Sequence, residues 1–97
     1  MRRRVHADPV TPELVELLRA RDGGCVAPLL GIPTPCGSQW GSGRIVLEID
    51  HVDNAGLGRR GPSTPANTVL LCGRHHRDKT EHARRWRELL HAYLAAA

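Results

Sequence analysis

One ten-residue stretch, Leu71 to Thr80, constrains this chain more than any other, because it holds a thiol, two adjacent imidazoles and three basic side chains. Two residues separate Cys72 from His75. That spacing suits two ligands of one tetrahedral zinc ion at a turn from a strand into a helix. We therefore expect a metal-binding turn here, with a short strand before it and a helix after it.

The core available to the rest of the chain is thin. The chain has 97 residues, no Phe, one Tyr and two Trp, so Leu, Val, Ile and Ala must supply most of the core. A domain of this size lies near the limit at which metals or disulfides become important for stability. We predict a single domain over residues 1–97 that depends on such an addition.

Cysteine usage favours a metal over disulfides. The chain has three cysteines, so a pure disulfide framework would leave one unpaired. Met1 to Arg4 is basic but no apolar run follows, so no signal peptide is visible. No segment is long enough to cross a membrane. We therefore expect a cytoplasmic protein without membrane contact, where Cys and His clusters more often hold metal than form disulfides.

Cys25 and Cys36 are the candidates for the other two zinc ligands. Ten residues separate them, which is longer than the usual knuckle. With Cys72 and His75 they would join the two halves of the chain and compensate for the thin core. Two alternatives stay open. Cys25 and Cys36 could form a disulfide or be buried as small apolar residues, and His76 could replace His75 as the zinc ligand.

Local signals divide the chain into an N-terminal scaffold and a C-terminal ββα unit, so the fold class is α+β. Thr11-Pro12-Glu13 predicts a helix start and Gly23-Gly24 its end. We expect Met1 to Val10 to be a mobile basic arm. The elements expected after the first helix are a loop over Cys25–Gly43, a strand over Arg44–Asp50, a loop over Asp53–Ala66, a strand over Thr68–Leu71 and a long helix from Arg74 toward Leu94.

A second cluster, Glu48-Ile49-Asp50-His51, lies at the end of the first expected strand. Hydrolysis of a phosphodiester needs a base for the attacking water and positive charge on the phosphate, which a divalent cation can supply. His51 suits the base because imidazole titrates near neutrality. Asp50 and His76 offer an oxygen and a nitrogen suited to Mg²⁺, Mn²⁺, Co²⁺ or Ni²⁺. Asn67 could bond a backbone carbonyl and fix the loop that presents His51.

Together these residues resemble the HNH endonucleases, whose active site is a ββα-metal motif. The family pattern usually ends in Cys-x-x-Cys-His-x-x-Lys-Thr, and here His75 stands where the second Cys is expected. The match is strong over roughly Leu47 to Thr80, and Arg21 to Cys25 is a further partial match. The resemblance is carried by Glu48-Ile49-Asp50-His51, Asn67 and Leu71-Cys72-Gly73-Arg74-His75-His76-Arg77-Asp78-Lys79-Thr80.

The resemblance implies a metal-dependent DNA endonuclease. It implies that His51 is the general base, that Asp50 and His76 bind the catalytic ion and that Asn67 orients His51. In some relatives the Asn itself reaches the metal. Small phage and prophage members suggest a monomer or weak dimer in the host cytoplasm, with a phage terminase as partner. The alternatives are a zinc-stapled DNA-binding module without catalysis and a toxin-like nuclease domain from a larger protein.

Charge supports a nucleic-acid partner. The net charge of +4 and the pI of about 9.6 favour a polyanion. On the last helix a solvated face explains Arg84, Arg85 and Arg87 at least as well as DNA contact does, and Trp86 is expected in the core. The residues expected to contact DNA phosphates are Arg59, Arg60, Arg74, Arg77 and Lys79.

Overall fold

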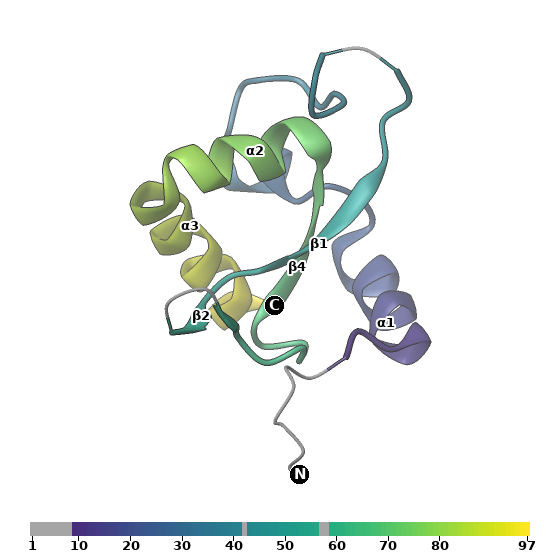
Figure 1. Ribbon diagram of the computed structural model, residues 1–97, viewed down its shortest axis with the longest axis vertical. Helices are drawn as coiled ribbons and strands as arrows, with labels where there is room; N and C mark the ends of the chain where they lie inside the picture. Colours follow the sequence, from purple (N-terminus) through teal and green to yellow (C-terminus); the bar gives the residue numbers. More distant parts are fainter. Residues whose placement is uncertain (1–8, 42, 57–58) are drawn as a thin grey trace, which may run out of the picture.

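Two antiparallel strands and the helix that follows them form the centre of the computed structural model, which describes residues 9–41, 43–56 and 59–97 (Figure 1). The described residues form a small α+β fold, the class that the sequence predicts, with three α-helices and two small antiparallel sheets. The expected basic arm lies mostly outside them. The elements are α1 (Pro12–Asp22), the 3₁₀ helix η1 (Ala27–Leu30), β1 (Leu47–His51), β2 (Asn54–Gly56), β3 (Arg59–Arg60), β4 (Thr68–Cys72), α2 (Gly73–Glu81) and α3 (Ala83–Ala96).

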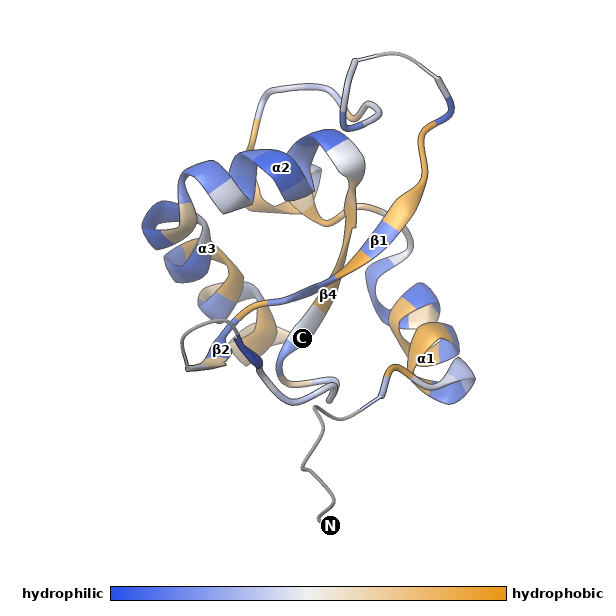
Figure 2. Ribbon diagram, in the orientation of Figure 1, coloured by the Kyte–Doolittle hydropathy of each residue, from blue (hydrophilic) through white to orange (hydrophobic). Residues whose placement is uncertain are grey.

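β4 is the most buried element, because both of its faces are covered. It pairs antiparallel with β1, with Leu47 opposite Cys72. Side chains alternate between the faces of a strand. Leu70 therefore packs against α1, while Val69 and Leu71 face α3 and η1. The apolar colouring of β4 continues onto the facing sides of these helices in Figure 2.

α1 begins and ends where the sequence predicts. The Thr11 hydroxyl accepts the Leu14 N–H at 3.1 Å, which caps the first turn. Gly23 ends the helix with a φ of 73°, a left-handed conformation that glycine adopts without a steric penalty. Leu14 and Leu18 point from α1 to Leu70 of β4.

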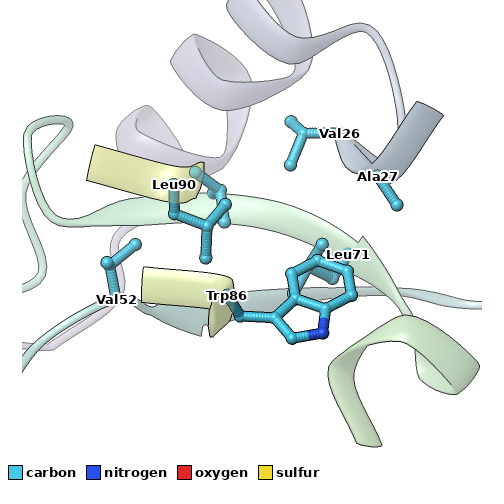
Figure 3. Packing of buried hydrophobic residues seen from close by; sticks show 7 residues of the cluster. Val26, Ala27, Val52, Leu71, Trp86 and Leu90 are labelled. Carbon is cyan, nitrogen blue, oxygen red and sulfur yellow. The ribbon is translucent and has the colours of Figure 1, made fainter. Parts of the chain in front are cut away.

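The main core lies between η1, β4 and α3 (Figure 3). Trp86 is only 1% exposed, so its predicted place in the core is confirmed. η1 lies within the stretch predicted as loop and brings Val26 and Ala27 to this core. No helix in the described part of the chain has both the length and the apolar character needed to cross a lipid bilayer.

The first strand starts later than predicted. β1 begins at Leu47 rather than Arg44, because β4 ends at Cys72 directly opposite. Residues 44–46 therefore have no strand to pair with in that sheet. Ile45 and Val46 are consequently 55% and 51% exposed. The strand predicted for residues 44–46 is thus wrong.

The predicted last helix is two helices, and the predicted second loop contains a hairpin. α2 ends at Glu81, and His82 has a non-helical φ of −132° and ψ of 50°. α3 starts in a new direction from that point, and Trp86 and Leu90 reach the core from it. The loop expected over Asp53–Ala66 holds the paired strands β2 and β3.

Candidate functional site

Four potential metal ligands from three segments of the chain meet at the turn between β4 and α2. Cys72 ends β4 and His75 lies in the first turn of α2, while Cys25 follows α1 and Cys36 precedes β1. The three sulfur atoms lie 3.1 Å (Cys72), 3.5 Å (Cys25) and 3.8 Å (Cys36) from Nδ1 of His75. All four ligand atoms lie within 4.8 Å of one another.

The spacing of these atoms fits one tetrahedral ion. Zn–S bonds of about 2.3 Å and Zn–N bonds of about 2.0 Å place sulfur and nitrogen about 3.5 Å apart, and the three observed distances bracket that value. Nε2 of His75 lies 2.9 Å from the Thr34 carbonyl oxygen. Donation from Nε2–H to this carbonyl leaves the Nδ1 lone pair directed at the sulfurs, the usual arrangement behind a metal-bound imidazole.

The structure bears on both alternatives left open for this cluster. All three cysteines are free thiols, so Cys25 and Cys36 form no disulfide. His75 belongs to the cluster, whereas His76 turns toward β1. The four residues predicted to bind zinc therefore lie together and could hold a structural metal ion.

The thiols of the cluster differ in how easily they ionise. Burial, with a smaller contribution from the neighbouring thiols, raises the pKa of Cys25 to about 12. Burial also opposes ionisation of Cys72, but the backbone N–H groups of His75 and Gly37 outweigh it and lower the pKa of Cys72. Cys72 is the N-cap of α2, a position that favours thiolate. A bound cation would favour loss of the protons from the other two thiols.

A second group of polar residues lies between β1 and α2. Glu48 and Asp50 are two residues apart on β1 and therefore share a face. His76 lies between their carboxylates, with Nδ1 2.5 Å from Oε1 of Glu48 and Nε2 3.3 Å from Oδ1 of Asp50. Oδ2 of Asp50 is the one buried side-chain oxygen or nitrogen in the described residues that has no hydrogen-bond partner. A buried oxygen without a partner is a natural ligand for a cation.

Asp50, His51 and His76 open into one hollow of about 390 Å³. Two charged side chains from other elements, Arg60 of β3 and Arg87 of α3, also line it. The sequence left Arg87 on a solvated face, but the fold of α3 turns it toward the candidate site. The remaining lining residues are Ile49, Val52, Asn54, Lys79, Thr80 and Ala83.

The two histidines of the hollow titrate in opposite directions. Hydrogen bonding to Asp50 and to Glu48 raises the pKa of His76 to about 9, although burial opposes this. Burial lowers the pKa of His51, and the nearby charge of Arg60 lowers it further. At neutral pH without a bound cation, His76 is therefore positively charged and His51 is neutral.

Asn67 and Ser63 fix the loop around His51. The Asn67 amide accepts the Asp53 N–H at 3.0 Å and donates to the carbonyls of Asp53 and Pro62 at 3.1 and 3.0 Å. Gly61 allows this close packing, since a Cβ there would lie 2.0 Å from the Asp53 carbonyl oxygen. Nε2 of His51 lies 2.9 Å from the Ser63 hydroxyl. No sequence pattern predicted the role of Ser63.

The residues predicted to contact DNA fall into different environments. Arg59 and Arg60 are exposed on β3. Lys79 instead points inward, and its ammonium donates to the carbonyls of His51 and Val52 at 3.1 and 3.3 Å. Arg74 donates to the Pro35 carbonyl at 3.3 Å, and Arg77 to that of Gln39 at 3.3 Å. Phosphate contact by these side chains stays a prediction.

The contact between Glu48 and His76 was also not predicted from the sequence. Its spacing of two residues from Asp50 on a predicted strand was the available signal.

No family model, no curated protein and no solved structure matches this chain. The function must therefore be argued from the geometry of these side chains.

Proposed function

We propose that the protein is a metal-dependent DNA endonuclease of the HNH class. One observation carries the proposal: a single hollow combines a neutral imidazole, a buried carboxylate oxygen without a partner and several cationic side chains. A base, a cation ligand and phosphate-binding groups are what phosphodiester hydrolysis requires. His51, Asp50 and Arg60 supply these three functions.

Asp50 and His76 are the residues that would hold the catalytic divalent ion. Glu48 accepts the Nδ1–H of His76 and so leaves Nε2 to face Asp50. This arrangement orients a ligand imidazole through its second nitrogen. A divalent ion there, such as Mg²⁺ or Mn²⁺, would neutralise charge on the phosphate and on the leaving oxygen.

His51 would act as the general base. Its Nε2 is engaged by the Ser63 hydroxyl, so Nδ1 would take the proton from water as the water oxygen bonds to phosphorus and the bond to the leaving oxygen breaks. The lowered pKa of His51 keeps this ring neutral and able to accept the proton at physiological pH. Asn67 would hold the ring's loop in place through Asp53.

The Cys25, Cys36, Cys72 and His75 cluster would hold a structural zinc ion with no open position. The adjacent side chains of His75 and His76 would thus serve two different metals, because successive helical residues point about 100° apart. Arg60, Lys79 and Arg87 would position the DNA backbone at the hollow. A terminase partner, a cytoplasmic location and a monomer or weak dimer stay predictions from the resemblance.

A plasmid-nicking assay with added Mg²⁺ or Mn²⁺ tests the proposal. The wild-type protein is expected to nick supercoiled plasmid, and His51→Ala to be at least about 100-fold slower. His82→Ala is the matched control, because His82 is exposed on the break between α2 and α3. An inert wild-type protein that still binds DNA would instead support a zinc-stapled binding module.

A further inference from the structure

Trp40 is the most exposed large apolar side chain among the described residues, at 74%. The chain's other tryptophan, Trp86, is buried at 1%. Full burial of a large apolar side chain contributes a few kcal/mol in general. The exposure of Trp40 therefore costs this small protein a part of its folding stability that burial of the ring would supply.

The loop that carries Trp40 is fastened to α2. The Arg74 N–H donates to the Gly37 carbonyl at 3.1 Å, and the Arg77 guanidinium donates to the Gln39 carbonyl at 3.3 Å. The two backbones also approach closely, since a Cβ on Gly73 would lie 2.7 Å from the Gln39 nitrogen. These contacts fix the base of the side chain.

One face of the Trp40 ring already has a partner. The Arg77 guanidinium carbon lies 4.9 Å from the ring centroid, a cation–π contact. Beside the ring lies a hollow of about 330 Å³, with Ser38, Gln39 and Arg74 in its lining. A stacked Arg–Trp pair beside amide groups is a surface on which a flat ring can stack and form hydrogen bonds.

The charges of this hollow indicate what it can take. Arg74 and Arg77 are balanced by Asp78 and Glu81, which also line it. Asp78 accepts the Trp86 indole N–H at 2.8 Å, and Glu81 lies 3.4 Å from Arg77. The hollow therefore suits a neutral planar group better than a phosphate. The basic hollow at Asp50 and His76 is the better place for the phosphate.

We propose that Trp40 is a stacking platform for an unpaired nucleobase of a DNA strand. The identity of the polymer rests on the proposed nuclease function. His76 of the catalytic hollow and Arg77 of the platform are adjacent in α2, so one strand could reach both. Bases within a duplex are paired and stacked on each other, so the platform favours single-stranded or mismatched DNA near the cleavage site.

Tryptophan fluorescence of the zinc-loaded wild-type protein, without added Mg²⁺ or Mn²⁺, tests the platform. Because Trp86 is buried, a change on adding DNA reports Trp40. We expect a thymidine oligonucleotide to quench the emission and a hairpin duplex of equal length to quench it less. In anisotropy with labelled single strands, Trp40→Ala should bind about tenfold more weakly, and Trp40→Phe should retain most of the affinity.

Three outcomes would contradict the proposed role of Trp40. The first is that Trp40→Ala binds single strands as tightly as the wild type, at unchanged melting temperature and zinc content. The second is equal quenching by single strand and duplex, and the third is an emission shift with protein concentration in the absence of DNA. The last would mean that Trp40 meets a second copy of the chain. Failure of the nuclease proposal would look different: quenching would persist while the wild-type protein failed to nick plasmid with Mg²⁺ or Mn²⁺.

Discussion

We predict that the zinc ion proposed for the Cys25, Cys36, Cys72 and His75 cluster is required for cooperative folding. The cluster joins segments that lie far apart in the sequence, and two of its residues, Cys25 and Cys36, lie outside the regular elements. The sizes of the opposing free energies decide the outcome. A domain of this length has a net stability of roughly 5–15 kcal/mol, while a structural zinc contributes about 10–16 kcal/mol in zinc-finger peptides at neutral pH.

Because the two quantities are similar, little or no net stability should remain without the ion. The ring of Trp86 lies 5.9 Å from that of His75, so the near-UV circular dichroism of Trp86 reports the packing beside the cluster. We expect a zinc chelator to remove this signal and the cooperative thermal transition, and added zinc to restore both. Cys72→Ser should behave like the chelated protein.

Protein that mass spectrometry finds metal-free but that melts at the same temperature as the untreated protein would contradict this prediction. The three thiols also predict the direction of the pH dependence. Protons compete with zinc for thiolates, so zinc should be lost as the pH falls. His82→Ala, outside the cluster, should change neither zinc content nor melting temperature appreciably.

The remaining predictions concern His76 and the divalent ion proposed to bind there. A metal ion can bind only the neutral form of His76, whose pKa is raised to about 9. The Mn²⁺ affinity, measured by electron paramagnetic resonance, should therefore rise up to about tenfold per pH unit from pH 7 to 9 and then level off. An affinity independent of pH would contradict this prediction. In the zinc-loaded protein without Mn²⁺ or Mg²⁺, the raised pKa of His76 stabilises the fold fully below about pH 6.5, and this contribution is lost as the pH rises through about 9. Glu48→Ala should weaken Mn²⁺ binding about 10- to 100-fold while zinc content stays constant, and Glu48→Gln, which keeps an acceptor oxygen, should lose less. Equal Mn²⁺ affinity in Glu48→Ala and wild type would reduce Glu48 to a structural partner of His76.

Several features of the fold follow from neighbouring residues alone. Thr11, Pro12 and Gly23 predict both ends of α1, because helix capping depends on atoms within a few residues. The spacing of Cys72 and His75 predicts their shared ligand geometry for the same reason. The break between α2 and α3 at His82 does not follow from neighbouring residues in this way. The apolar pattern is helical on both sides of it, and the packing of Trp86 on the core decides the direction of α3.

Residues far apart in the sequence could be paired only by the folded structure. Asp22 illustrates this, since it accepts the Leu70 N–H at 3.0 Å and the Tyr93 hydroxyl at 2.5 Å and so ties α1 to β4 and α3. The position of Arg87 in the hollow lined by Asp50 and His76 likewise depends on how α3 packs. Neither contact leaves a periodic signal in the sequence.

The sequence by itself determined the ligand types, the α+β class and the adjacency of His75 and His76. Chemical type and local spacing are properties of short segments, so they can be read without the fold. Only the tertiary structure decided that His75 joins the cysteines while His76 faces Asp50 and Glu48. That choice depends on where β1 and the Cys25 and Cys36 segments pack against α2, and hydrophobic burial across the whole chain sets those positions.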